Sequence, residues 1–289
     1  MTTHTATTRE RRTSDAHIPS PSLTLSAAIT FVVLLCAPSV ATAATRWVND
    51  NAASYTPPGT SCTRAGYATI QAAVNAASAG DVIKVCPGKY VENVLVAESN
   101  LMISSTAGAA ATMVKAAASM YVFVVAASGV TVSGFTIIPA GVADGDIGVN
   151  VAIEGATGLR ILNNVIFGGR IGINLGCVSS ASLIAYNTVN SQTEAGINID
   201  TCEAPPFPGS HNNSIHHNIA CSVTATASIA LGGSSDINRI QYNVATKISV
   251  FGTGNVVRYN TTQAAIVDNG SGSTLNNNLV DAGVCPAAP

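Results

Sequence analysis

Charged side chains are scarce in this sequence, since Asp, Glu, Lys and Arg together make up 10% of its 289 residues. The 13 basic residues do not outnumber the 15 acidic ones, so no excess of positive charge is available to neutralise phosphates, which excludes nucleic acid as a partner. Aromatic residues are also few, at 5%, whereas hydrophobic residues make up 47%. This balance is the opposite of a disordered composition, so we expect one large folded domain or two small ones.

The sequence also lacks a hydrophobic run long enough to span a membrane. The apolar stretch near its amino terminus, Leu23–Ala37, is shorter than the roughly 20 residues that a spanning helix needs. Three arginines precede this stretch within residues 1–22, and the small residues Ala41–Ala43 follow it. This order is typical of a secretory signal peptide. We therefore expect residues 1–43 to be removed and residues 44–289 to be secreted, either outside the cell or into a periplasm, with no membrane span.

Cysteines occur without the spacing of a metal site. Of the seven, all but Cys36 follow the predicted cleavage point, which leaves an even number behind an export signal and predicts disulfides. No Cys-x-x-Cys pair and no Cys/His cluster at zinc spacing occurs, so we expect neither a metal nor a cofactor.

A short repeat fills most of the remaining chain. An aliphatic residue, two variable residues and an Asn recur, with successive Asn residues 17 to 31 positions apart. The repeated Asn residues are Asn164, Asn187, Asn218, Asn243, Asn260 and Asn278. Repeats of this period indicate a solenoid, and short β-branched units punctuated by Gly indicate that it is built from strands.

The repeated Asn residues have a structural explanation. Asn tolerates the left-handed conformation that tight turns need, so we expect these residues to adopt it. In stacked coils about 4.8 Å apart, their amides would hydrogen-bond in a ladder. Aromatic rings directly precede four of them, and we expect these rings to stack on one another rather than bind a ligand. The four aromatic residues are Tyr186, His217, Tyr242 and Tyr259.

A second pattern falls between these turns and repeats three times: a charged residue, an aliphatic or Ala, Gly, an aliphatic, Asn and an aliphatic. The three copies are 146–151, 170–175 and 194–199. Strand alternation predicts that Val149, Ile173 and Ile197 point inward. The Gly, the Asn and the charged residue of each copy would then share the outward face, as a shallow groove with a glycine floor that suits an extended sugar chain.

These repeats resemble the right-handed parallel β-helix of the pectin-lyase-like superfamily, and its carbohydrate-binding and sugar-hydrolysis repeat group. The amino-terminal segment agrees, with Tyr67–Val74 followed by Gly80–Val85 and Gly88–Val94. The likeness covers about residues 46–283. It implies an all-β, right-handed parallel β-helix over residues 44–289, with a short amino-terminal helix that plugs the barrel end inside the cap region 44–96.

The helix also follows from the residues themselves, because Ile70, Ala73, Val74 and Ala77 lie on one helical face. The catalytic signatures of pectin methylesterases (Gln-Ala-Val-Ala-Leu and Asp-Phe-Ile-Phe-Gly) and the Gly-His-Gly of polygalacturonases do not occur. The resemblance therefore carries no named chemistry to this chain.

The coil register also predicts the disulfide pairing. Cys177 and Cys202 follow the Gly of two consecutive coils at nearly the same distance, and adjacent coils are within disulfide range. Cys62 and Cys86 flank the predicted helix, and we expect them to pair. Cys221 is then left for Cys285, which requires the tail to fold back over several coils.

The candidate catalytic residues are the charged column Asp146, Arg170 and Glu194. Asp146 and Glu194, two coils apart, would be separated by roughly 9–10 Å, near the upper end for an inverting glycosidase. Arg170 would instead bind a uronate carboxylate or act as the base of a β-elimination. The structural alternative is that Arg170 bridges the two acids on adjacent strands. The candidate substrate-binding residues on the same face are Asn150, Asn174, Asn198 and Asp200.

Three histidines follow the predicted cleavage point, His211, His216 and His217. Neighbouring residues on a strand point to opposite sides, which makes a joint metal site of His216 and His217 awkward, so we expect a solvated loop.

The functional hypothesis is an exported β-helix protein that binds or acts on an extracellular polysaccharide or cell-surface glycan. As an enzyme it would be a polysaccharide lyase or a glycoside hydrolase. The alternative is a non-catalytic surface solenoid for adhesion or self-association, and an accessory factor for a periplasmic metalloenzyme is a third possibility.

Overall fold

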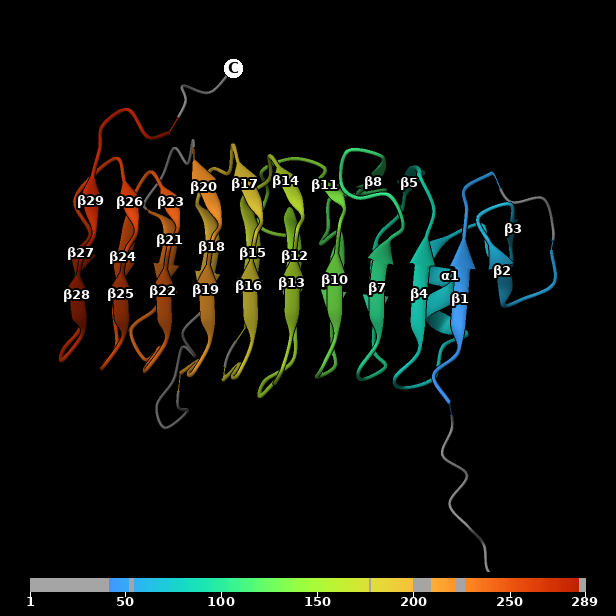
Figure 1. Cartoon of the computed structure of the whole chain (residues 1–289), viewed down its shortest axis with the longest axis horizontal. Helices are drawn as coiled ribbons and strands as arrows, with labels where there is room; N and C mark the ends of the chain where they lie inside the picture. The colour runs from blue at the N-terminus through green and yellow to red at the C-terminus, as the bar shows by residue number, and fades with distance from the viewer. Residues whose placement is uncertain (1–41, 52–54, 177, 200–208, 222–226, 286–289) are drawn as a thin grey trace, which may run out of the picture. The chain divides into compact units, whose positions relative to one another are not determined.

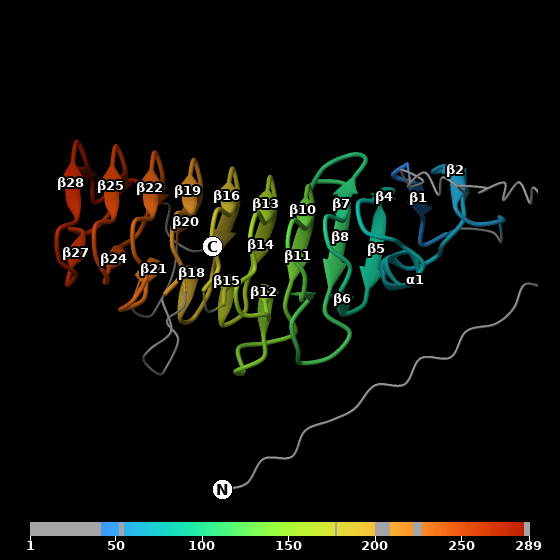
Figure 2. The same ribbon diagram turned by 90° about the horizontal axis from the view of Figure 1, so that it is seen from below.

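A computed structural model describes residues 42–51, 55–176, 178–199, 209–221 and 227–285. The described residues form three long parallel sheets, and the chain visits them in turn, so that each coil adds one strand to each sheet (Figure 1). Figure 2 shows the same coils from below, stacked side by side from β1 to β28. The architecture is therefore a parallel β-helix, as the repeats predict. The predicted signal peptide lies outside the described residues, apart from its last two positions.

Each sheet gathers every third strand of the solenoid. The first sheet holds β1 (Thr45–Val48), β4 (Val82–Val85), β7 (Met102–Ser105), β10 (Thr131–Ser133), β13 (Arg160–Leu162), β16 (Leu183–Ala185), β19 (Ser214–His216), β22 (Arg239–Gln241), β25 (Val256–Arg258) and β28 (Thr274–Asn276). The second sheet holds β5 (Gly88–Val91), β8 (Thr112–Lys115), β11 (Thr136–Ile138), β14 (Val165–Phe167), β17 (Thr188–Asn190), β20 (Ile219–Cys221), β23 (Val244–Ala245), β26 (Thr261–Thr262) and β29 (Leu279–Val280). The third sheet holds β6 (Val94–Val96), β9 (Phe123–Val125), β12 (Ile147–Val151), β15 (Ile171–Leu175), β18 (Ala195–Ile199), β21 (Ala227–Leu231), β24 (Ile248–Val250) and β27 (Val267–Asp268).

The core is a set of aliphatic columns that run along the solenoid. In the first sheet one column is in register through seven successive coils, and all its members are fully buried. Its members are Ile103, Val132, Ile161, Ile184, Ile215, Ile240 and Val257. Because inward positions take apolar residues or uncharged ladder residues, few positions remain for charged side chains, and the low charge content follows from the architecture.

The six repeated Asn residues form the predicted ladder, called here the inner ladder. From Asn164 to Asn260, each backbone N–H and each side-chain Nδ2 donates to the Oδ1 of the Asn on the next coil. The N···Oδ1 distances for the backbone donors are 2.9 to 3.0 Å. The ladder therefore satisfies buried backbone and side-chain polar groups coil by coil.

The predicted left-handed conformation of these Asn residues is wrong. It is adopted instead by the residue directly before each of them, with φ between 54° and 60°. These residues are Asn163, Tyr186, His217, Tyr242, Tyr259 and Asn277. The turn happens one residue earlier, and this turns the ladder amide inward, where it bonds to the backbone of the preceding coil.

A second inner ladder, which the sequence repeats did not predict, lies at the start of the first-sheet strands. Its members are Ser182, Asn213, Asn238 and Asn255, with backbone N–H to Oδ1 distances of 2.9 to 3.0 Å. Each member lies five residues before a member of the inner ladder, on the other side of the same strand. That fixed spacing is the signal that could have revealed it.

The helix α1 (Ile70–Asn75) packs at the amino-terminal end of the solenoid. Thr69 accepts a hydrogen bond from the Ala72 N–H as its N-cap, and the Glu92 carboxylate accepts the N–H groups of Ile70 and Gln71. Burial raises the pKa of Glu92 above its usual value. The side chains of Ile70, Ala73 and Val74 are buried in the same core as the first coils. A short antiparallel pair, β2 (Gly59–Ser61) and β3 (Arg64–Ala65), lies beside β1.

Two predicted disulfides are confirmed. Cys62 bonds to Cys86, and Cys221 bonds to Cys285. The tail reaches Cys221 by running back along the second sheet, where the Ala282 carbonyl accepts a hydrogen bond from Gln263. The predicted Cys177–Cys202 pair lies outside the described residues. In the described part of the chain, no helix has the length and hydrophobicity to cross a membrane.

Candidate functional site

Three asparagines form a second kind of ladder on the outer face of the third sheet, called here the outer ladder. Asn150, Asn174 and Asn198 occupy equivalent positions of β12, β15 and β18. The Nδ2 of Asn174 donates to Asn150 Oδ1 at 2.9 Å, and the Nδ2 of Asn198 donates to Asn174 Oδ1 at 2.8 Å. The predicted column is therefore confirmed as an arrangement. Asn150 and Asn174 are only 7% and 8% exposed, so neighbouring residues enclose the row.

The outer ladder leaves hydrogen-bonding capacity unused. An Asn amide has two N–H donors and two acceptor lone pairs. Within the described residues, each ladder contact uses one donor and one acceptor, and the Nδ2 of Asn150 and the Oδ1 of Asn198 make no hydrogen bond. The row therefore offers donors and acceptors at intervals of one coil.

The predicted glycine floor beside this ladder is wrong, because the glycines point into the barrel. A Cβ added at Gly148 would lie 2.8 Å from the Ile166 side chain, which is part of the core. The equivalent positions Gly172 and Gly196 likewise face Val189 and Ala220 of the second sheet. Strand alternation is broken here, since Val149 also points inward. Each Gly lies where the chain, coming from the second sheet, begins a strand of the third sheet. A side chain at this position would clash with the second sheet, so only Gly fits there.

The predicted charged column is in register, but Asp146 is not on the surface. The backbone N–H of Arg170 donates to the Asp146 carbonyl, and that of Glu194 donates to the Arg170 carbonyl, so the three residues stack on successive coils. The Asp146 side chain is 1% exposed. Its carboxylate accepts hydrogen bonds from Ser119 Oγ at 2.9 Å and from the Ala143 N–H at 2.7 Å. It holds the loop before β12, which is a structural role that the sequence alone did not indicate.

Arg170 bridges two acids, of which Glu194 is predicted and the other is Asp144 instead of the predicted Asp146. Its Nη1 pairs with Glu194 Oε2, and its Nε lies 3.9 Å from Asp144 Oδ1. The side chains of Arg170 and Glu194 are 26% and 45% exposed. Among the described residues, Arg170, Glu194 and the fully exposed Asp144 are accessible charged groups beside the outer ladder. Asp200, the fourth predicted binding residue, lies outside the described residues.

Two hollows extend the same face toward the amino-terminal coils. Val124 pairs with Asn150, and Leu95 pairs with Val124, so the column of the outer ladder continues as apolar residues. A hollow of about 380 Å³ opens over them, walled by Asn93, Met120 and Tyr121. This hollow is not evident from the sequence, because isolated outward apolar residues form a patch only once the register is known.

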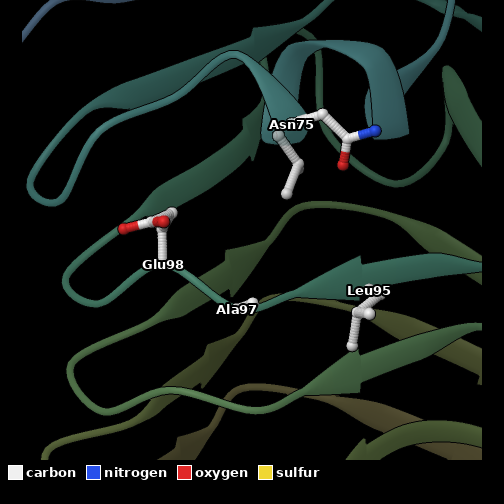
Figure 3. Close-up of a pocket in the computed structure, with 5 residues that line it drawn as sticks. Asn75, Leu95, Ala97 and Glu98 are labelled. Carbon is white, nitrogen blue, oxygen red and sulfur yellow. The ribbon is translucent and has the colours of Figure 1, made fainter.

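The second hollow, of about 270 Å³, shares Leu95 with the first and reaches α1. Figure 3 shows Asn75 at the end of the helix, facing the segment that carries Leu95, Ala97 and Glu98. Gln71 holds the two sides together, because its side chain accepts the Leu95 N–H and donates to Asn75.

The predicted stacking of the four aromatic rings is confirmed, and the row is called here the aromatic stack. Neighbouring ring centroids from Tyr186 through His217 and Tyr242 to Tyr259 are 5.0 to 5.1 Å apart, with interplanar angles of 5° to 23°. Arg258 lies over the Tyr259 ring at 5.7 Å. The rings cover one another's faces, so the stack presents mainly ring edges to solvent.

Solved structures that resemble this one share its architecture. A pectate lyase, Pel9A, superposes with a TM-score of 0.53 and 12% identity, over 86% of this chain and 80% of the lyase. The catalytic domain of a GH87 α-1,3-glucanase variant in complex with tetrasaccharides superposes with a TM-score of 0.50 and 18% identity, over 67% of this chain. The chain is a right-handed parallel β-helix with the pectin-lyase-like fold.

The resemblance to these solved structures concerns the fold of this β-helix and not its function. The chain spans 37% of the glucanase chain. A pectin methylesterase from Aspergillus niger superposes at 12% identity over 84% of this chain and 88% of the esterase, with a TM-score of 0.42. No family model and no curated protein sequence matches the chain. Its function must therefore be argued from its own residues.

Proposed function

We propose that this chain is an exported β-helix protein that binds an extracellular polysaccharide or cell-surface glycan along the outer face of the third sheet. The observation that carries the proposal is the outer ladder, a row of enclosed amides with spare donors and acceptors. Sugar hydroxyls both donate and accept hydrogen bonds, which is what such amides need. The row repeats at the coil spacing of about 4.8 Å, so it suits a ligand that is itself a linear repeat.

The surroundings of the ladder support this proposal. Arg170 and Glu194 flank it on one side, and the hollow over Leu95 and Val124 continues it on the other. An arginine held by a glutamate can exchange that partner for a substrate carboxylate, such as that of a uronate. An apolar hollow beside polar anchors fits the hydrophobic face of a sugar ring. The glucanase that shares the fold was solved with tetrasaccharides.

Binding is better supported than catalysis. An inverting glycosidase needs two carboxyl groups that face the same bond, and both oxygens of Asp146 are engaged by Ser119 and Ala143. The accessible pair Arg170 and Glu194 leaves a β-elimination as the enzymatic alternative, with Arg170 on the substrate. Asp146, Arg170 and Glu194 thus stay as proposed catalytic residues with unequal support.

A polysaccharide panel tests the proposal. The chain 44–289 is incubated with neutral and acidic polysaccharides, and binding, new reducing ends and the absorbance of unsaturated uronates are measured. We expect binding that Asn174→Leu weakens at least tenfold. The matched control is Asn276→Leu, an exposed Asn on the outer face of the first sheet, which we expect to leave binding unchanged. Equal binding by both variants, or no binding by the parent chain, contradicts the proposal.

Two further expectations belong to this proposal. Export rests on the order of residues 1–43, and cell fractionation with amino-terminal sequencing of the mature chain tests it. We also propose that α1 closes the amino-terminal end of the barrel, because Ile70, Ala73 and Val74 cover the first coils. A Val74→Asp variant that keeps its full stability would contradict this role.

A second candidate function, self-association, is favoured by the carboxyl-terminal coil. Leu275 and Val280 continue the core columns of Val257 and Thr262, yet they are 39% and 56% exposed. Strands β28 and β29 are the last strands of their sheets, so the outer edge of each has no neighbouring strand among the described residues. Cys285 ties the tail back to Cys221, so the tail leads away from this end. An uncovered apolar end with free strand edges is a pairing surface.

A second copy of the chain, joined end to end through this coil, is the partner we propose. A head-to-tail filament is disfavoured, since α1 occupies the opposite end. Sedimentation at several concentrations should show a dimer that Val280→Lys converts to monomer. Leu279→Lys is the matched control, because Leu279 is exposed on the outer face and continues the column of Thr261. A parent chain that stays monomeric at all concentrations contradicts this function.

A further inference from the structure

We propose that His216 and His217 together bind a divalent copper or nickel ion on the outer edge of the first sheet. The two imidazoles converge there, and the polysaccharide proposal does not use them. The Nδ1 atoms of the two rings lie 2.9 Å apart. Within the described residues, neither ring makes another hydrogen bond.

This convergence overturns the expectation that the two rings point to opposite sides. His216 is the last residue of β19, and His217 has a φ of 55°. A left-handed residue at a strand end breaks the alternation, so consecutive side chains fall on the same side of the chain. The same turn places every residue of the aromatic stack, which is why His217 lies among tyrosines.

Packing fixes both rings before any ion arrives. His217 lies between Tyr186 and Tyr242, with centroid distances of 5.1 Å and interplanar angles of 22° and 23°. His216 stands edge-on to His217 at 88° and edge-on to Tyr186 at 88°. His216 is half-buried and His217 is exposed, so solvent and ions reach the pair. A site whose ligands are already oriented loses little entropy on binding.

The separation of the two nitrogens is that of a hydrogen bond, and it also fits one kind of metal site. Imidazole nitrogens bind first-row metal ions at about 2.0–2.1 Å, so two of them at right angles lie roughly 2.9 Å apart, and at a tetrahedral angle roughly 3.4 Å apart. The observed distance matches two neighbouring positions of a square-planar site, which Cu²⁺ and Ni²⁺ prefer. Water would complete the coordination.

The protonation state of the pair is compatible with an ion. Metals bind neutral imidazole, and both burial and the neighbouring His217 lower the pKa of His216. In the hydrogen-bonded pair one Nδ1 carries the proton and the other accepts it. When the ion enters, the donating ring keeps one proton by moving it to Nε2, so both Nδ1 lone pairs face the metal and the charge of each ring is unchanged.

Two substitutions taken from the chain's own columns test the site. Gln241 follows His216 in its column and Tyr242 follows His217, so His216→Gln and His217→Tyr should preserve the fold. The protein tested is the chain 44–289, and the control is His211→Gln, which changes its remaining histidine. Within the described part of the chain, the His211 ring makes one hydrogen bond, with the Gly209 carbonyl. The chain carries no purification histidines, and Cu²⁺ is titrated by calorimetry and followed by electron paramagnetic resonance.

We expect one Cu²⁺ per chain, with a tetragonal spectrum that shows hyperfine coupling to two nitrogens. His216→Gln and His217→Tyr should each weaken binding at least tenfold and remove one nitrogen from the spectrum, and His211→Gln should change neither. Thermal melts without metal check that all three variants are folded. Binding that is absent from the parent chain, or unchanged in the first two variants, overturns the proposal. Because polysaccharide binding is measured on another face, its failure leaves this result intact.

Discussion

The inner ladder and the outer ladder are both rows of stacked asparagines, yet they differ in what their amides still have to offer. In the inner ladder Asn218 accepts two hydrogen bonds from Asn187 and donates to Ile184, His216 and Asn243. In the outer ladder each contact between neighbours is one amide bond. The first row is saturated by the backbone around it, and the second is not.

The difference teaches how to separate structural from binding asparagines in a solenoid. Asn164 and its equivalents bond to backbone groups at the turns, where no neighbouring strand supplies a partner. Their side-chain amides therefore have no donor or acceptor left for a ligand. Asn150, Asn174 and Asn198 lie mid-strand, where the backbone is already paired, so their amides serve only one another and what approaches from outside. Position relative to the strand, rather than residue type, decides the role.

The largest expected effect comes from breaking the inner ladder. Asn218→Ala removes the acceptor for the Asn187 N–H, which is left buried without a partner, and it also removes a donor to the Ile184 carbonyl. An orphaned buried N–H costs about 1–3 kcal/mol, and the other hydrogen bonds of the Asn218 side chain are lost with it, so we expect a loss of about 3 kcal/mol in the free energy of unfolding. Denaturant unfolding measures it. Asn276→Ala, at an exposed position, should cost less than about 0.5 kcal/mol.

A second substitution should stabilise the turn that precedes the second inner ladder. Ile237 precedes Asn238 of the second inner ladder with a φ of 55°, although it is β-branched and 55% exposed. The left-handed conformation costs a non-glycine residue about 1–2 kcal/mol. Ile237→Gly should therefore raise the free energy of unfolding by about 1 kcal/mol, as measured by denaturant midpoint at constant slope. A lower midpoint would show that the turn is not strained.

The outer ladder should respond in the opposite way, with a small change in stability and a large change in binding. Asn174→Ala removes both amide bonds of the row, at Asn150 and at Asn198, but orphans no backbone group. We expect a stability cost of about 1 kcal/mol. Polysaccharide affinity should fall at least tenfold. A stability cost as large as that of Asn218→Ala would place the outer ladder among the structural rows.

Much of the fold could be predicted from the sequence because the same residue pattern recurs in successive coils of the solenoid. The inner Asn column and the aliphatic columns follow from spacing, and the two disulfides follow from the position of Cys62 and Cys86 around the helix and, for Cys221 and Cys285, from elimination. The second inner ladder was missed because Ser182 takes the place of an Asn in its first coil, which hides the repeat.

The candidate site was harder to predict, because strand alternation fails at corners. Gly148 marks a bend at which two successive residues face inward, so the glycine floor disappeared. Asp146 lies just before that bend, and whether it faces solvent depends on the loop 139–146, which has no repeat to constrain it. The pairing of His216 with His217 depends on a backbone φ that no residue pattern announces.

The smallest expected effect concerns the Arg170–Glu194 pair beside the outer ladder. Both side chains are partly exposed, so the ion pair should contribute only about 0.2–1 kcal/mol, and less at high salt. A double-mutant cycle with Arg170→Met and Glu194→Gln measures that coupling by denaturant unfolding at low and high salt. If the pair serves only the fold, both single variants should bind polysaccharide as the parent does. If Arg170 exchanges Glu194 for a ligand carboxylate, Glu194→Gln should strengthen the binding of an acidic polysaccharide, because it frees the arginine. Arg170→Met should weaken that binding. The binding of a neutral polysaccharide should change in neither variant. Opposite signs from two halves of one ion pair cannot come from lost stability, which has the same sign for both.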